Sequence, residues 1–446
     1  MIVDSCMFDF IRSFVDGVGT LNEEQSRALD LMNSDRNIFV TGGAGTGKSF
    51  LIRAFCKQNK GKNIIITAPT GVAAQNVKGA TLHRTFRIPT KLLSPNEPTL
   101  NNKAVTEVLH KTNVVIIDEI SMCREDVFTY VARYIAEENL RRKRMKSTPE
   151  PIQLILVGDF MQLPPVITNS EKNLFTQLWG NSQGFAFMSK AWDYFNIHTI
   201  KLTEVMRQKE DSFSSALNKI RKNDSAALDY LNSHKATARI EQAINLCATN
   251  ATADKINREK LEAIKKPKVA LEMTFKGDVT KIKNSDLVCE KELVLKVGAR
   301  VMILVNDPGL LYSNGSMGTV SDFENPDDLA NRGVWVELDS GQRVLIENNK
   351  WSIVEYEVTG EGKECKTEAK EVASYTQIPL KLAYAITIHK SQGQTYDSVN
   401  IDVSGIFAAG QLYVALSRCK TIENTWFNAP ITEKQMKISY AVKDFA

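Results

Sequence analysis

The feature that most constrains this chain is the stretch FVTGGAGTGKSF, residues 39–50, which places four glycines and a lysine between apolar flanks. Glycines let successive backbone N–H groups curl around one anion. Residues 38–41 (IFVT) are mainly apolar and rich in β-branched side chains, as expected of a buried strand, and FLIRAFC at 50–56 is typical of a helix. A helix that begins directly after such a loop adds the partial positive charge of its N-terminus. The stretch therefore predicts a strand, a phosphate-binding loop and a helix within an α/β fold.

The loop fits the pattern G-x-x-x-x-G-K-[ST], which selects a nucleoside triphosphate with Mg²⁺. Lys48 would reach the β- and γ-phosphates, and the Ser49 hydroxyl would be a Mg²⁺ ligand. The alternative is an ordinary glycine-rich turn, which the flanking strand and helix make the weaker interpretation. The residues predicted to bind ATP are Gly42, Gly43, Ala44, Gly45, Thr46, Gly47, Lys48 and Ser49.

Two further strands end in polar residues that suit hydrolysis. VVIIDEISM at 114–122 places Asp118 where it would hold Mg²⁺ and Glu119 where it would position or deprotonate the attacking water. LILVGDFMQLPPV at 154–166 places Gln162 where it would sense the γ-phosphate, on a loop stiffened by Pro164 and Pro165. Alone, each would be an ordinary strand end or turn; together with the phosphate loop they predict an enzyme that hydrolyses a nucleoside triphosphate.

The amino-acid composition restricts the class of protein but does not identify a substrate. The 446 residues are 43% hydrophobic, and 56 basic against 52 acidic residues leave a net charge of +4. This balance permits local basic patches for nucleic acid but does not require them. The seven cysteines are dispersed without a CxxC pair, so neither a zinc site nor a disulfide framework is expected. With no targeting segment or apolar run long enough for a membrane, we expect a cytoplasmic protein, nucleoid-associated if bacterial.

The order of the apolar runs predicts the domain organisation. Short strands alternate with helices through the first half, and the pattern returns near the C-terminus. Between them, alternating segments are separated by the turn signals Asn314-Gly315 and Asp339-Ser340-Gly341. We therefore expect a first α/β domain at 1–198, a second at 199–265 and 378–446, and a β-rich insertion at 266–377.

The motifs together resemble those of the Pif-type (petite integration frequency) 5′-to-3′ DNA helicases, a superfamily-one group related to RecD. Beyond the segments above, the resemblance rests on LNEEQ (21–25), APTGVAA (68–74), GATLHRTF (79–86), LTEVMRQ (202–208), LCATN (246–250), AYAITIHKSQGQTYD (383–397) and GQLYVALSR (410–418). These run in the family's order across nearly the whole chain. The resemblance implies two RecA-like domains, the second carrying a small Src-homology-like β-barrel. It also implies a short, wedge-bearing insert near 84–104 in the first domain.

The resemblance also implies an activity. It is that of an ATP-dependent DNA helicase that uses Mg²⁺ and moves 5′-to-3′ on single-stranded DNA, with hydrolysis coupled to closure of a cleft between the motor domains. Its DNA partners would be single strands and junctions with duplex, and the resemblance also allows guanine quadruplexes. Repair, recombination and telomere maintenance are the implied processes, and a monomer in solution is expected. Two alternatives stay open: the same motor acting on RNA or stripping proteins from DNA, and a nucleotide switch whose hydrolysis only times a conformational change.

Further ATP-site residues are implied by the same resemblance. Gln25 would read adenine, although a glutamine on a helix surface is the commoner arrangement. Arg207 and Arg418 would reach the γ-phosphate from the second domain, and Gly393 would lie close to it. Arginines delivered in this way stabilise charge only when the domains close.

DNA contacts are implied on both domains. On the first they are Pro69, Thr70, Gly71, His83, Phe86, Pro164 and Pro165, and on the second Asn250, Thr252, His389, Lys390 and Ser391. His83 and Phe86 could stack on a base, with a core aromatic as the alternative for Phe86. The basic stretch 133–151, which includes the run RRKR at 141–144, is either a solvated helix end or a patch that faces duplex DNA.

Overall fold

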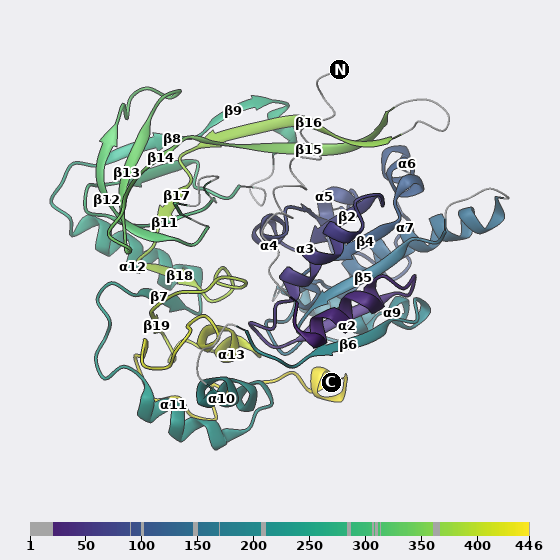
Figure 1. The fold of residues 1–446 in the computed structure, drawn as a ribbon, viewed down its shortest axis with the longest axis horizontal. Helices are drawn as coiled ribbons and strands as arrows, with labels where there is room; N and C mark the ends of the chain where they lie inside the picture. Colours follow the sequence, from purple (N-terminus) through teal and green to yellow (C-terminus); the bar gives the residue numbers. More distant parts are fainter. Residues whose placement is uncertain are drawn as a thin grey trace. The chain divides into compact units, whose positions relative to one another are not determined.

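The computed structural model describes residues 21–445 apart from 90, 100–101, 146–149, 169, 207–210, 283–286, 306, 308–310, 313 and 360–365. The chain forms two compact units, and Figure 1 labels their helices and strands. Unit 1 comprises Met1–Arg207, Glu355–Lys370 and Ile438–Ala446, and unit 2 comprises Gln208–Val354 and Glu371–Lys437. Within the described part of the chain, no helix is both long and apolar enough to span a bilayer.

Unit 1 is built on a six-stranded sheet with the order β3-β2-β4-β5-β1-β6. Every pair of neighbouring strands is parallel. The strands are β1 (Ile38–Gly42), β2 (Ile64–Ala68), β3 (Ala80–Thr81), β4 (Val114–Ile117), β5 (Gln153–Gly158) and β6 (His198–Leu202). All the predicted strands of the first half are present, so the parallel P-loop core is confirmed.

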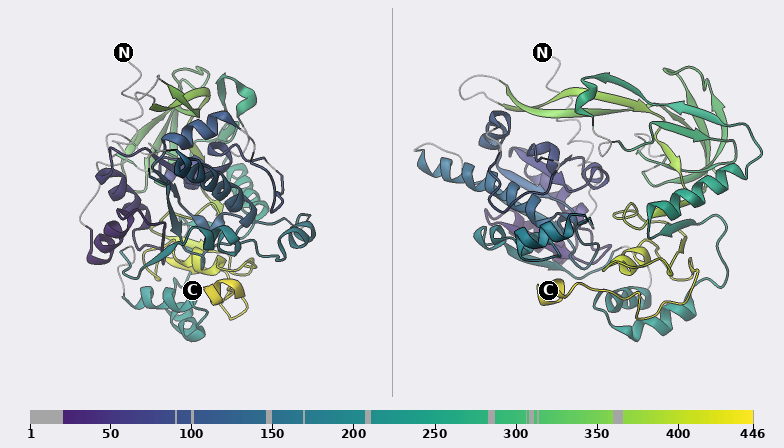
Figure 2. Two further views of the ribbon diagram at one scale, coloured as in Figure 1. Left: turned by 90° about the vertical axis from the view of Figure 1, so that its right-hand side faces the viewer. Right: turned by 180° about the vertical axis from the view of Figure 1, so that it is seen from behind.

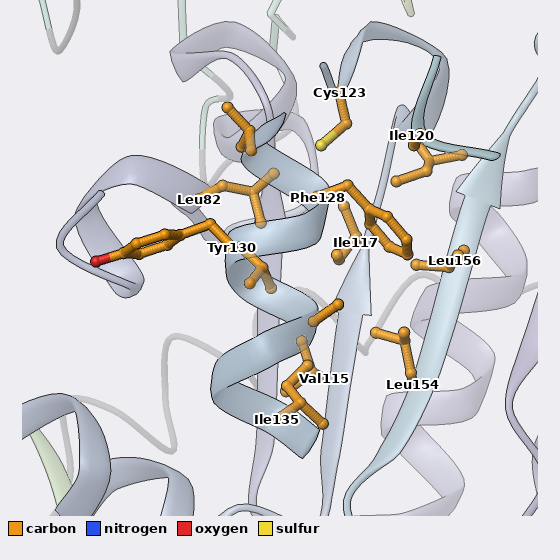
Figure 3. Close-up of a cluster of buried hydrophobic side chains, with 14 of the residues drawn as sticks. Leu82, Val115, Ile117, Ile120, Cys123, Phe128, Tyr130, Ile135, Leu154 and Leu156 are labelled. Carbon is orange, nitrogen blue, oxygen red and sulfur yellow. The ribbon is translucent and has the colours of Figure 1, made fainter. Parts of the chain in front are cut away.

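Successive residues of a strand point to opposite sides of the sheet, and β4 and β5 are buried at every position, so both faces of the sheet are apolar. Helices cover both faces. Ile116 and Ile155 face one core with α2 (Glu23–Met32) and α3 (Lys48–Gln58). Val115 and Leu154 face the other, which α6 (Lys103–Lys111), α7 (Glu125–Arg144) and α9 (Lys190–Tyr194) complete. Figure 3 shows Phe128 and Ile135 of α7 against β4 and β5, and Figure 2 shows the helices from two further directions.

Unit 2 contains a four-stranded sheet with the order β18-β7-β19-β20, again with every neighbouring pair parallel. Its strands are β7 (Ile244–Cys247), β18 (Ala385–Thr387), β19 (Val399–Ile401) and β20 (Thr425–Phe427). Its helices include α10 (Asp211–Arg221), α11 (Leu228–His234), α12 (Asn250–Glu262) and α13 (Gln411–Leu416).

The segment between α12 and β18 is β-rich, as predicted for 266–377. Its sheets have the orders β14-β13-β12-β11-β17, β15-β16-β9 and β10-β8. The strands are β8 (Val269–Glu272), β9 (Thr274–Gly277), β10 (Glu292–Leu295), β11 (Arg300–Ile303), β12 (Met317–Glu324), β13 (Gly333–Leu338), β14 (Arg343–Glu347), β15 (Asn349–Thr359), β16 (Lys366–Gln377) and β17 (Leu380–Leu382). The two glycine turns join β11 to β12 and β13 to β14, with Gly315 at φ 96° and Gly341 at φ 83°. Closure of these sheets into a barrel stays a prediction.

Besides residues 355–370 of the predicted insertion, two segments that the sequence places in the second domain belong to unit 1. β6 pairs with β1 along its whole length, from Ile38 opposite His198 to Gly42 opposite Leu202. The C-terminal helix α14 (Tyr440–Phe445) also lies in unit 1, where Val442 is 1% exposed in the core. Periodicity identifies a strand or helix but not its partners, so both assignments needed the fold.

The basic run at the end of α7 is only partly a solvated surface. Arg142 is 1% exposed, and its guanidinium donates to the carbonyl oxygens of Leu109 (2.7 Å) and Thr112 (2.8 Å) at the end of α6. It also pairs with the buried Glu138 at 3.3 Å. A cation at a helix C-terminus satisfies carbonyls that lack intrahelical partners. Arg142 thus stabilises the neighbouring helix, whereas Arg141, Lys143 and Arg144 are exposed.

We expect Arg142→Ala to destabilise the protein by roughly 1–3 kcal/mol, because the buried carbonyl oxygens of Leu109 and Thr112 would lose their donor. Arg144→Ala is the matched control from the same run, and it should change stability by less than about 0.5 kcal/mol. Thermal unfolding of the two variants makes the comparison. Equal midpoints would show that Arg142 does not hold α6.

Candidate functional site

The phosphate-binding loop lies between β1 and α3, as the sequence predicts. Gly45 and Gly47 have φ values of 83° and 81°, a backbone conformation that L side chains rarely adopt. Gly47 is the N-cap of α3, so Lys48 and the exposed Ser49 occupy the first turn of that helix. Backbone N–H groups in the first turn of a helix lack intrahelical partners, so a loop that leads into such a turn suits an anion.

The interior of the loop is held by hydrogen bonds. The Thr46 hydroxyl donates to the Gly43 carbonyl at 3.0 Å, and the Lys48 ammonium donates to the carbonyls of Gly42 and Gly43 at 2.9 Å each. Thr46 and Ala44 are buried, at 1% and 7% exposed. The lysine thus lies across the mouth of the loop, next to the position where phosphate oxygens would bind.

Two glycines are required by close approach rather than by phosphate. A Cβ at Gly42 would lie 2.6 Å from the Leu202 carbonyl oxygen, at the end of β6. A Cβ at Gly47 would lie 2.4 Å from Nε2 of Gln25. At Gly42 the neighbour is backbone, so a larger residue is excluded. At Gly47 a Cβ would have to displace the Gln25 side chain and adopt a strained φ of 81°.

Gln25 is buried and holds the loop from α2. Its Nε2 donates to the Thr46 carbonyl at 3.2 Å, while its Oε1 accepts from the Asn22 backbone N–H at 3.2 Å. Asn22 accepts in return from the Gln25 backbone N–H at 2.7 Å, which completes a capping box. The surface alternative for Gln25 is therefore wrong, whereas its adenine-reading role stays a prediction.

Sequence reasoning missed a second link from α2. Glu24 accepts from the backbone N–H groups of Thr203 at 2.8 Å and Glu204 at 3.0 Å, and Met206 N–H donates to the Gly45 carbonyl at 2.9 Å. The stretch that follows β6 is thus tied to the phosphate loop. The N-x-x-Q spacing of a capping box could have marked this helix start; nothing in the sequence marked the partner of Glu24.

The acidic pair follows β4 directly. Asp118 is 4% exposed and accepts from the Glu119 backbone N–H at 2.9 Å. Burial, and then the neighbouring Glu119 charge, raise the pKa of Asp118 to about 7, while the Glu119 N–H and the Lys48 charge lower it. Glu119 has a φ of 50°, unusual for a residue with a side chain. Such strain is a feature of functional sites.

Gln162 lies on the turn after β5, which pairs with both β1 and β4. Its backbone N–H donates to the Asp159 carbonyl at 2.9 Å, and Met161 N–H donates to the Asp159 carboxylate at 3.1 Å. A Cβ at Gly158 would lie 3.0 Å from the Ile120 backbone nitrogen. Three neighbouring parallel strands, β4, β5 and β1, therefore end at the same edge of the sheet. They are followed there by the acidic pair, the Gln162 turn and the phosphate loop.

This edge suits Mg²⁺ with a triphosphate. Ser49 and Asp118 offer a hydroxyl and a carboxylate, the hard oxygen ligands that Mg²⁺ takes alongside phosphate and water. Two ligands from the protein are enough, and no cluster of three or more His, Cys, Asp or Glu side chains occurs among the described residues. A bound cation would favour the charged Asp118 carboxylate despite its burial.

The arginine candidates for phosphate contact have a different setting. Arg418 is 1% exposed; its guanidinium donates to the carbonyls of Val414 at 2.9 Å and of Ser391 and Gln394 at 3.1 Å. It thereby fastens the turn that contains Gly393, whose φ is 79°. Arg207 lies outside the described residues.

The DNA-contact candidates of unit 1 divide into half-buried and buried groups. Thr70 precedes α4 (Gly71–Asn76), and its hydroxyl accepts from the Ala73 N–H at 3.3 Å. Phe86 is 0% exposed and packs 6.2 Å from the Tyr134 ring, so base stacking by Phe86 is wrong and the core alternative holds. Pro69, Gly71, His83 and Pro164 are half-buried, whereas Pro165 is buried.

The candidates of unit 2 follow β7 and β18, which pair with each other. Asn250 begins α12 and is exposed, and the Thr252 hydroxyl lies 2.9 Å from that of Thr249, the N-cap. His389 is half-buried, and burial lowers its pKa. Lys390 is exposed, whereas Ser391 is buried and donates to the Ile388 carbonyl at 2.7 Å, so its hydroxyl is already used.

Comparison with known proteins gives one consistent result. A model of the PIF1-like helicase family matches residues 20–234. The ATP-dependent DNA helicase Pif1 of Bdellovibrio bacteriovorus is 33% identical over 411 residues, a match that covers 90% of this chain and 86% of that protein. The crystal structure of Bacteroides Pif1 in complex with ADP-AlF4 has a TM-score of 0.81 at 35% identity, and Bacteroides Pif1 bound to ssDNA has 0.68 at 35%. Each structural match covers 96% of both chains.

We expect Gly47→Ala to abolish binding of Mg·ATP, because the new methyl group would displace Gln25 and strain a φ of 81°. Gly180→Ala is the control, since Gly180 has a φ of 73° but open space around it. It should keep the affinity of the unchanged protein. Titration calorimetry measures both variants, with circular dichroism to verify folding. Normal affinity in Gly47→Ala would contradict the geometry given for the loop.

Proposed function

The chain belongs to the PIF1-like helicase family, and from this premise we propose that it is an ATP-dependent DNA helicase that moves 5′-to-3′ on single-stranded DNA. The observation that carries the proposal is the common edge of β1, β4 and β5, where Lys48, Asp118 and Gln162 follow neighbouring parallel strands. A site of this kind hydrolyses a nucleoside triphosphate mainly by positioning and charge stabilisation. The matching proteins named above as helicases agree with that chemistry.

In the proposed reaction, different residues of unit 1 bind the phosphates, hold Mg²⁺ and activate the attacking water. The N–H groups of the loop and the Lys48 ammonium bind the phosphates, so Lys48 exchanges its two carbonyl partners for phosphate oxygens. Ser49 and Asp118 would hold Mg²⁺, which supplies positive charge against the phosphates when bound. Glu119 orients the water and takes its proton, and Gln162 contacts the γ-phosphate.

Two arginines supply the response to hydrolysis in this proposal. Arg207 and Arg418 complete the γ-phosphate site when the cleft between the motor domains closes. Arg418 holds the Ser391 and Gln394 carbonyls, so any movement towards phosphate would also loosen the turn at Gly393. That turn adjoins His389 and Lys390, which we assign to DNA. The bound nucleotide and the bound DNA strand would in this way both act on the segment from His389 to Gln394.

The DNA path uses the half-buried and exposed candidates of both units. Thr70, His83 and Pro164 lie in unit 1, and Asn250 and Lys390 lie in unit 2. Pro69, Gly71, Thr252 and His389 complete the set. Contacts of this kind to the backbone weaken with salt, with a log–log slope of roughly 0.7 for each single-strand phosphate neutralised. One related structure is that of Bacteroides Pif1 bound to ssDNA, and another concerns DNA unwinding at forked dsDNA by Pif1 helicases, which supports these substrates.

The finer parts of the proposal are the polarity, the coupling to cleft closure, the wedge near 84–104 and the barrel at 266–377. Binding of guanine quadruplexes and a monomeric state belong to the same group. Motif chemistry alone does not fix polarity, since polarity depends on which unit releases the strand during closure. For this reason 5′-to-3′ movement rests on the family.

We expect Glu119→Gln to bind Mg·ATP normally but to lose turnover by about 10²–10⁴-fold, because an amide cannot accept the proton of the attacking water. Glu107→Gln, a change on helix α6, is the matched control and should keep normal turnover. The measurement is the ATPase rate with and without single-stranded DNA, together with nucleotide affinity. A helicase is stimulated by the strand; an unstimulated rate would favour a nucleotide switch.

A further inference from the structure

Six aromatic side chains of unit 1 form one cluster beside the ATP site. The members of this aromatic cluster are Phe39, Phe160, Phe185, Phe187, Trp192 and Phe445. Five of them lie in the first 192 residues, whereas Phe445 comes from α14 at the far end of the chain. The helix is drawn at the end marked C in Figure 1.

Phe160 connects the cluster to the hydrolysis site. It lies between Asp159 and Gln162 in the turn after β5 and is 5% exposed. Its ring is 4.8 Å from that of Phe187, 5.3 Å from Phe39 and 5.6 Å from Phe445. Because the turn is short, the position of this ring constrains the backbone that presents Gln162.

Phe445 fits into the cluster as a packed member. It stacks on Phe187 with centroids 4.1 Å apart and planes 15° apart, and it meets Trp192 edge-on at 5.7 Å. It also lies 6.4 Å from Phe39, on the strand that leads into the phosphate loop. Such aromatic pairs contribute beyond the apolar area they bury. Phe445 therefore contacts both elements that deliver the phosphate loop and Gln162.

The rest of α14 is anchored to unit 1 as well. Val442 is 1% exposed within the unit 1 core, and the Ser439 hydroxyl donates to the Gln183 side-chain carbonyl. Tyr440, in contrast, is 82% exposed on the same helix. The face of α14 that carries Phe445 and Val442 is thus the packed one, and Tyr440 offers a control position.

We propose that α14 is a positioning element for hydrolysis: Phe445 completes the aromatic cluster that fixes Phe160 and, through the turn, Gln162. The proposal rests on the ATPase function proposed above. Phe445 touches no reacting atom, so its effect is on the geometry of Gln162. Because α14 follows directly after the end of unit 2 at Lys437, the chain links unit 2 covalently to the helix whose Phe445 packs against Phe160.

The test compares three variants of the full chain. Phe445→Ala should lower kcat for ATP by about 10- to 100-fold with KM little changed, as expected when a catalytic group is slightly misplaced. Phe445→Tyr keeps the ring and should restore kcat, and Tyr440→Ala should behave as the unchanged protein. Affinity for ADP with aluminium fluoride should fall in proportion to kcat, whereas affinity for ADP should not.

Hydrogen exchange provides a readout that does not depend on activity. In Phe445→Ala the amides of residues 159–163 should exchange faster, since Met161 and Gln162 are bonded to Asp159 within that turn. A uniform rise over all of unit 1, or normal kcat with unchanged exchange at 159–163, would overturn the inference. If the protein without any substitution shows no ATPase activity, the proposed function is contradicted instead. The hydrogen-exchange comparison would still decide whether Phe445 positions the turn at 159–163.

Discussion

The site depends on the close approach of backbone and side chains around two glycines. At Gly42 the phosphate loop meets the backbone at the end of β6, which leaves no room for a Cβ, and at Gly47 a Cβ would have to displace the Gln25 side chain. These contacts hold the start of α3 between α2 and the sheet, so the helix N-terminus and Lys48 face the phosphate position. Substitutions at the two positions would change the geometry of the loop before they changed its chemistry.

A second support lies beneath the loops. The ring centroids of Phe39 on β1 and Phe160 after β5 lie 5.3 Å apart in the aromatic cluster. The strand before the phosphate loop and the turn that carries Gln162 therefore pack against the same group of aromatic side chains. Gly158 allows the end of β5 to approach Ile120, which follows the acidic pair. The three functional segments are thereby coupled through close-packed contacts, which transmit small displacements because protein interiors have few voids.

Sequence alone predicted what local chemistry determines. The glycine spacing gave the strand, loop and helix around Lys48, and the turn signals at Gly315 and Gly341 gave the two hairpins. It did not predict what depends on distant partners. Phe86 has the spacing of a stacking residue yet is buried beside Tyr134, and Arg142 belongs to a charge run yet caps another helix. Neither β6 as a partner of β1 nor α14 as part of unit 1 follows from periodicity.

The most direct test of the account is unwinding of two duplexes that differ only in whether the single-stranded tail is 5′ or 3′. Each receives the protein with Mg²⁺ and ATP, and strand separation is followed by fluorescence, with the non-hydrolysed analogue of ATP as the blank. The account predicts that the 5′-tailed duplex opens and the 3′-tailed duplex does not. Preferential opening of the 3′-tailed duplex would contradict the direction, and ATP hydrolysis that opens neither duplex would contradict the proposed helicase activity.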